Sequence, residues 1–66
     1  MDKLYTMQRA RDGKRVEFYS ELRAGKLTYI IRENSNESQD SVTTDRSAIE
    51  TFREGLLREG YMQMPI

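Results

Sequence analysis

One two-residue turn and the residues around it constrain this chain most. If Ala24-Gly25 is the loop of a β-hairpin, the apolar side chains on either side of it face one another in pairs. A three-residue loop with a glycine bulge is the alternative, and it would pair Phe18 with Ile30 and Leu22 with Lys26. The apolar pairing favours the shorter loop. It predicts Leu22/Leu27, Ser20/Tyr29 and Phe18/Ile31 on one face, and Glu21/Thr28, Tyr19/Ile30 and Glu17/Arg32 on the other.

A second turn, Asp12-Gly13, predicts a third strand on the same sheet. Read as another two-residue loop, it places Met7 opposite Phe18 and Tyr5 opposite Ser20, on the same apolar face. Residues 4–10, 15–22 and 27–33 are therefore expected as three antiparallel strands, because each alternates apolar and polar positions between glycine-containing turns. Residues 34–40 are a polar loop, and residues 41–43 are a candidate short fourth strand.

A helix is expected from about residue 45 to about residue 59. Thr44 or Asp45 is the predicted N-cap, Ser47 and Glu50 also fit a capping box one turn later, and Gly60 is the expected stop. A glycine inside the apolar stripe of this helix suggests a close approach to the sheet, and Glu54 and Arg58 have the spacing of an ion pair. The stripe consists of Ala48, Ile49, Phe52, Gly55 and Leu56.

These elements predict an α+β fold, a three- to four-stranded antiparallel β-meander with one C-terminal α-helix packed on one face. Residues 1–66 would form a single domain that ends in an apolar tail, residues 61–66. Such a short chain buries only a small core, and this favours a homodimer. The expected core comprises Tyr5, Met7, Val16, Phe18, Leu22, Leu27, Tyr29 and Ile31 of the sheet with Ile49, Phe52 and Leu56 of the helix.

Composition narrows the classes of function. Cysteine and histidine are both absent, so the sequence predicts no disulfide, no metal site, no cofactor and no catalytic residues, and we expect a protein that is not an enzyme. No segment resembles a signal peptide or a membrane span, so a cytoplasmic location is the expectation. The formal net charge is zero, with 11 basic and 11 acidic residues, but the two halves of the chain differ. Residues 1–32 contain eight basic and four acidic residues (+4), and residues 33–66 contain three basic and seven acidic residues (−4).

The predicted outer face of the sheet is the first candidate binding surface. Small domains hold single-stranded nucleic acid on basic sheets with exposed aromatic rings, and Tyr19 is the aromatic residue on this face. Single-stranded nucleic acid is therefore the first candidate partner. The candidate contacts are Tyr19, Arg15, Arg23, Lys26 and Arg32.

A protein partner is the alternative. A small regulator or inhibitor would use the outer sheet face together with the C-terminal tail, which is unusually rich in methionine for a chain end. The tail either folds back over the core or docks onto a partner subunit. The candidate interface residues are Ile30, Tyr61, Met62 and Met64.

Residues 20–29 (SELRAGKLTY) resemble a turn segment of the bacterial PUR-domain (Pur-alpha-like) proteins. Ala48, Phe52, Arg53 and Leu56 resemble the helix that closes a PUR repeat, and the order of strands followed by one helix is similar over about 50 residues. The resemblance implies binding of single-stranded DNA or RNA on a curved sheet, and pairing of two repeats. Carried over by position, it implies contacts from Tyr19, Arg23 and Lys26.

Overall fold

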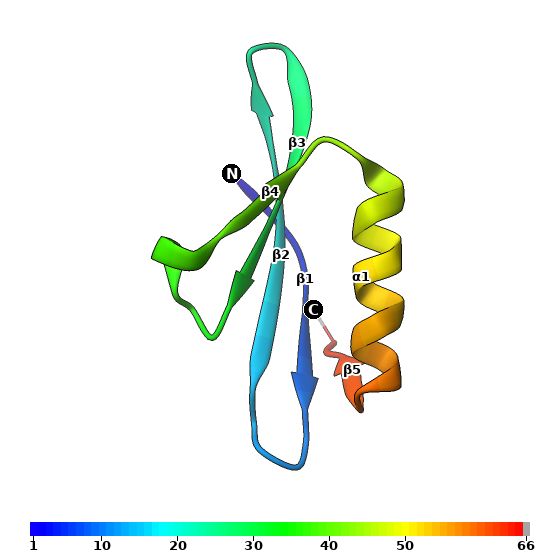
Figure 1. The fold of residues 1–66 in the computed structure, drawn as a ribbon. Coiled ribbons are helices and arrows are strands. Elements are labelled where there is room, and N and C mark those ends of the chain that lie inside the picture. The colour runs from blue at the N-terminus through cyan, green and yellow to red at the C-terminus, as the bar shows by residue number, and fades with distance from the viewer. Residues whose placement is uncertain (66) are drawn as a thin grey trace.

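Five antiparallel strands and one helix make up residues 1–65, the part of the chain that the computed structural model describes (Figure 1). The α+β class is confirmed, but the sheet has five strands where three to four were expected. Along the sheet the order is β4-β3-β2-β1-β5. The elements are β1 (Asp2–Arg9), β2 (Arg15–Arg23), β3 (Lys26–Glu33), a 3-10 turn η1 (Glu37–Gln39), β4 (Ser41–Thr43), α1 (Arg46–Arg58) and β5 (Tyr61–Gln63).

The β2–β3 hairpin has the predicted register. Phe18 lies opposite Ile31 and Leu22 lies opposite Leu27. The two loop residues both have positive φ, 50° at Ala24 and 76° at Gly25, as a type I′ turn requires. The twist of this turn matches the twist of the strands, so the turn fixes the pairing of all eight residue pairs.

The β1–β2 connection is longer than predicted. Tyr5 lies opposite Phe18 and Met7 opposite Val16, so the predicted register is wrong by two residues. Residues 10–13 form the loop, which Asp12 organises by accepting hydrogen bonds from the Arg9 guanidinium and from the Lys14 N–H. A shift of two residues leaves Tyr5 and Met7 on the predicted apolar face, so the face assigned to these two residues is correct despite the wrong register.

Helix α1 begins and ends close to the predicted positions. Asp45 is the N-cap, and its carboxylate accepts from the Ser47 N–H at 2.9 Å. The helix ends before Gly60, which has φ 93° and donates its N–H to the Leu57 carbonyl. No helix within residues 1–65 has the length and the apolar character needed to cross a membrane.

Strand β5 is the element that the sequence did not predict. The chain folds back after α1 and pairs with β1, so that Tyr61 lies opposite Arg9 and Gln63 opposite Met7. Tyr61 is buried, and the Arg9 guanidinium lies 4.8 Å from its ring centroid. Within the predicted tail, residues 61–63 therefore form an edge strand of the sheet, and Ile66 lies outside the described residues.

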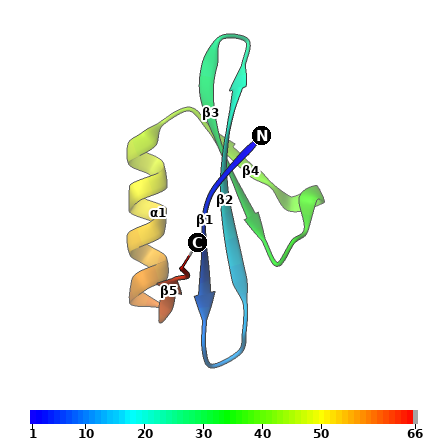
Figure 2. The same cartoon turned by 180° about the vertical axis from the view of Figure 1, so that it is seen from behind.

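The core lies between α1 and the β1–β2 end of the sheet (Figures 1 and 2). Three residues predicted for it are exposed instead: Leu22 by 74%, Leu27 by 50% and Phe52 by 36%. The ring of Phe52 meets Phe18 edge-on from the border of the core, at a centroid distance of 6.1 Å. The buried cluster consists of Met7, Val16, Phe18, Ile31, Ile49, Leu56 and Tyr61.

Two predictions about the helix itself are wrong. A methyl group added at Gly55 would meet nothing within 4 Å, so this glycine marks no close approach to the sheet. Arg58 donates to the backbone carbonyl of Glu54 rather than to its carboxylate. The ion pair along the helix is Arg46–Glu50, with nitrogen and oxygen 3.6 Å apart.

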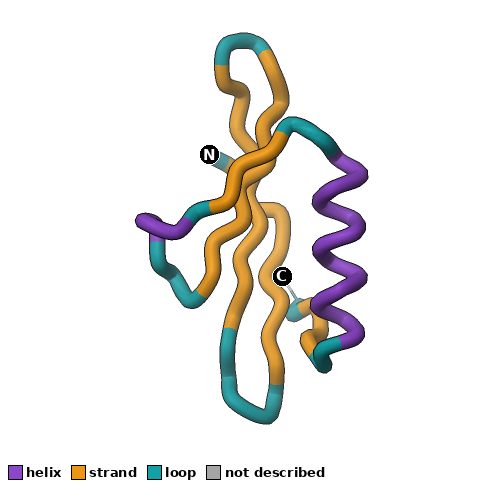
Figure 3. The backbone as a smooth tube through the Cα atoms, in the orientation of Figure 1, coloured by secondary structure: helices purple, strands orange, loops and turns teal. Residues whose placement is uncertain are grey.

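Helix and hairpin differ in length, and this difference explains the exposed leucines. Thirteen helical residues span about 20 Å, whereas the nine residues of β2 span about 30 Å. The tube in Figure 3 shows the β2–β3 hairpin continuing past the first turn of α1. The far end of the hairpin therefore has no helix over its apolar face.

Candidate functional site

A polar network covers the outer face of the sheet, the predicted nucleic-acid surface. The Arg32 guanidinium donates to both Asp40 carboxylate oxygens, at 3.0 and 2.9 Å, and lies 5.0 Å from the centroid of the Tyr19 ring. This bidentate bond raises the pKa of Arg32 and lowers the pKa of Asp40. Arg32 is thus held by Asp40 and in turn covers one side of Tyr19.

Glu17 anchors the other side of this network. Its carboxylate accepts from Lys3 at 2.7 Å, from the Tyr19 hydroxyl at 3.0 Å and from Ser35 at 3.3 Å. The Lys3 bond is the main cause of the lowered pKa of Glu17, and burial is the main cause of the raised pKa of Tyr19. The Tyr19 ring is therefore fixed at its edge by Glu17 and beside its face by Arg32.

The other predicted nucleic-acid contacts lie at opposite ends of β2. Arg15 is at the start of β2, whereas Arg23 and Lys26 are at the β2–β3 turn. Arg23 forms an ion pair with Glu21 on its own strand. Arg15 and Lys26 are exposed and form no ion pair within residues 1–65. The structure brings Tyr19 and Arg32 together and leaves the other three candidates at the two ends of the sheet.

The predicted protein-interface residues divide into buried and exposed ones. Ile30 is 1% exposed, because it lies on the outer face between its cross-strand neighbours Tyr19 and Val42. Tyr61 is also buried. The described fold thus leaves these two side chains little surface with which to contact a partner. Met62 and Met64 are exposed, by 69% and 38%.

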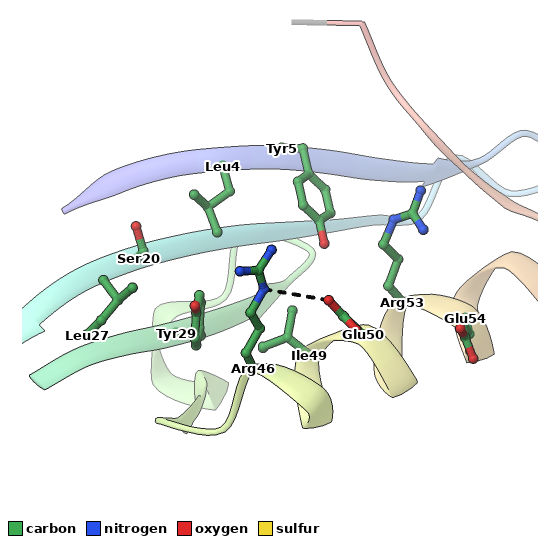
Figure 4. Close-up of a pocket in the computed structure, with 10 residues that line it drawn as sticks. All are labelled: Leu4, Tyr5, Ser20, Leu27, Tyr29, Arg46, Ile49, Glu50, Arg53 and Glu54. Atoms are coloured by element: carbon green, nitrogen blue, oxygen red, sulfur yellow. Dashed lines mark ion pairs between the residues drawn. The ribbon is translucent and has the colours of Figure 1, made fainter.

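A groove with a volume of about 620 Å³ lies between α1 and the sheet (Figure 4). A register shift between Lys3 and Tyr5 places the consecutive residues Leu4 and Tyr5 on the same side, facing the helix. The floor is mainly apolar, and charged side chains of α1 form the rim. The lining residues are Leu4, Tyr5, Ser20, Leu27, Tyr29, Arg46, Ile49, Glu50, Arg53 and Glu54.

The rim carries both signs of charge. Arg46 pairs with Glu50, and Arg53 donates to the side-chain carbonyl of Gln63 on β5 at 3.1 Å. Burial is the main cause of the raised pKa of Tyr5, so its hydroxyl stays protonated over the neutral range. The groove therefore combines an apolar floor, a hydroxyl donor and balanced ionic edges, which suits apolar side chains flanked by charged ones.

The apolar floor continues onto the end of the hairpin. Leu27 lines the groove and also faces Leu22 across the strands, and both leucines are at least half exposed. We call the residues at this end, 22–27, the hairpin tip. Uncovered apolar surface thus runs without interruption from the groove to the tip.

Sequence reasoning missed the groove because alternation identifies the face of a strand and not what covers it. Leu22 and Leu27 were assigned to the core by their face alone. The comparison of helix length with strand length was available in the sequence and would have indicated an uncovered end. The bulge near Leu4 leaves no comparable signal.

Comparison with known proteins identifies no relative. No protein-family model matches the chain, and no significant match was found among curated proteins or solved structures. Among residues 1–65, no three acidic residues lie close enough together to hold a metal ion.

Proposed function

We propose that this protein is a small, non-enzymatic module that binds another protein in the groove between α1 and the sheet. One observation carries the proposal: the apolar surface of the groove continues to the exposed Leu22 and Leu27. Contiguous exposed apolar surface with a polar rim is typical of protein interaction sites. This is the alternative function expected from the sequence, moved from the outer face to the helix-side face.

The groove fits the side chains of an extended segment. Its volume of about 620 Å³ lies within the range of about 300–1,000 Å³ common for binding pockets. Alternate side chains of an extended chain point the same way, so two leucines in such a segment would reach the floor together. The charges of Arg46, Glu50 and Arg53 at the rim would then orient the polar positions between them.

Binding rather than catalysis is proposed because of the chemistry of the lining. Ser20 is the only hydroxyl nucleophile on the floor besides the two tyrosines, and the chain contains no histidine to activate it. The carboxylates at the rim belong to Glu50 and Glu54, on the exposed side of α1. These groups serve recognition.

Single-stranded nucleic acid on the outer face is the second candidate function, and the resemblance to PUR domains supports it. Arg15 and Lys26 favour it, since both are exposed and form no ion pair with the described residues 1–65, which suits phosphate contacts. Stacking of a base on Tyr19 would require Arg32 to leave both the ring and the Asp40 carboxylate. This cost places the nucleic-acid function second.

A peptide titration followed by NMR tests the proposed function. The probe is the peptide Lys-Leu-Thr-Leu-Lys, and the matched control peptide has serine in place of both leucines. The leucine peptide should shift the methyl resonances of Leu4, Leu27 and Ile49, and Leu27→Lys should abolish the effect. Val42→Lys is the control variant, because Val42 is 51% exposed on a strand outside the groove, against 50% for Leu27.

Equal binding by the two lysine variants, or no shift in the wild-type protein, would refute binding in the groove. Fluorescence anisotropy with short oligo-dT and oligo-rU at two salt concentrations tests the second candidate. A salt-sensitive signal that Arg15→Ala and Lys26→Ala weaken would favour nucleic acid, since each phosphate contact releases counterions.

A further inference from the structure

The molecule is more extended than a compact domain of the same chain length. Its accessible surface is 4674 Å², against about 4,400 Å² for a compact monomer of 7.8 kDa. Its radius of gyration is 11.8 Å, against roughly 10.8 Å for a compact domain of this length. Figures 1 and 2 show the β2–β3 hairpin standing out beyond the end of α1.

The projecting hairpin tip has the chemistry that the groove accepts. Leu22 and Leu27 lie opposite each other on one face of the tip, with side chains exposed by 74% and 50%. They form a rigid apolar pair, because the Ala24-Gly25 turn sets their register. The chain thus presents both an apolar groove and an apolar projection, joined through Leu27.

The tip is basic, and the rim includes carboxylates that can pair with its cations. Residues 22–27 of the tip include Arg23 and Lys26 and no acidic residue, whereas the rim carries Arg46 and Arg53 as well as Glu50 and Glu54. At the tip Lys26 is exposed and forms no ion pair within residues 1–65. At the rim the carboxylates of Glu50 and Glu54 flank the groove.

We propose that the occupant of the groove is a second copy of this chain, with the hairpin tip of each copy seated in the groove of the other. This inference rests on the proposed function and names its partner. Tip and groove adjoin on one surface, so a two-fold axis beside Leu27 makes both contacts at once, as an isologous dimer requires. Tip and groove together supply the apolar centre of such a contact, which in a specific dimer buries about 600–1,000 Å² per copy.

Sedimentation velocity from low to high micromolar concentration tests the dimer. The wild-type protein should pass from a monomer of 7.8 kDa to a species of twice that mass. Leu22→Thr should weaken the dimer at least about tenfold, because Leu22 would be a central buried contact. The matched control is Val42→Thr, which removes similar exposed apolar surface from a strand outside the contact and should leave the dimer unchanged. Circular dichroism of each dilute variant checks that the monomer folds.

Charge reversal supplies a sharper test. Lys26→Glu and Glu50→Lys should each weaken self-association, since each places like charges at both contacts of the dimer. An equimolar mixture of the two variants should recover association, because every contact between unlike copies then joins opposite charges. A merely structural effect of either substitution would not be repaired by mixing.

The outcomes separate this inference from the proposed function. If wild type stays monomeric while the leucine peptide still binds in the groove, the second copy is excluded and the binding function stands. A dimer that Leu22→Thr does not weaken, and that the charge variants do not alter, overturns the proposed contact. If neither the peptide nor a second copy binds, both proposals fail together.

Discussion

Replacing Gly55 with alanine should stabilise this protein. Gly55 lies in the interior of α1, where glycine costs about 1 kcal/mol relative to alanine because its backbone loses more freedom on folding. The added methyl group would meet no atom within 4 Å, so no steric penalty offsets this gain. We therefore expect the free energy of unfolding to rise by about 1 kcal/mol.

Thermal unfolding followed by circular dichroism measures the effect. For a domain of this size, 1 kcal/mol corresponds to a rise in Tm of about 4–8 °C. The measurement belongs at low concentration, because self-association would add its own stabilisation. Gly60→Ala is the matched control: its φ of 93° is unfavourable for alanine, and the variant should lose about 1–2 kcal/mol.

The opposite result would refute the described helix packing. A Gly55→Ala variant that is less stable than wild type would mean that the helix approaches another group at this position. That was the expectation from the sequence, where glycine within an apolar stripe suggested close contact. The structure instead predicts that the variant is more stable than wild type, so this single substitution distinguishes the two expectations.

Three further predictions concern the core, the added strand and acid stability. Phe18→Ala should cost about 3–5 kcal/mol in urea unfolding and Phe52→Ala only about 2, because Phe18 is 1% and Phe52 36% exposed. Tyr61→Ala should cost roughly 3 kcal/mol, whereas Met62→Ala should change stability by less than about 0.5. The Arg9 hydrogen bond lowers the pKa of Asp12 from 3.8 to about 2, so the unfolded state binds the proton first. The stabilisation from the Arg9–Asp12 hydrogen bond is therefore present above pH 3.8 and lost toward pH 2. Asp12→Asn should flatten this part of the plot of unfolding free energy against pH.

Local chemistry determined most of the fold. The Ala24-Gly25 turn fixes the β2–β3 register within a few residues, and Asp45 and Gly60 fix the ends of the helix. Each signal depends on neighbours along the chain, so the sequence reveals it directly. At the Asp12-Gly13 turn the same reasoning failed, since Asp12 bonds to Arg9 and Lys14 and stabilises a longer loop.

Contacts between distant segments decided the candidate site. Tyr19 and Arg32 were correctly placed on one face, but only the folded loop brings Asp40 to the Arg32 guanidinium. Ile30 alternates outward and yet is buried, because side chains of the neighbouring strands close over it. Neither result follows from residue type and spacing, since both require the path of residues 34–43.

The sequence by itself determined which side chains share a face, because the strand period of two and the helical period of 3.6 are properties of the backbone. Only the tertiary structure decided which parts of those faces are covered. A helix of thirteen residues cannot span a hairpin whose strands have nine and eight residues, so the apolar face divides into a buried core and an open groove with an uncovered tip. Coverage depends on relative lengths and on the placement of α1 and β5, and these are set by packing between segments far apart in the chain.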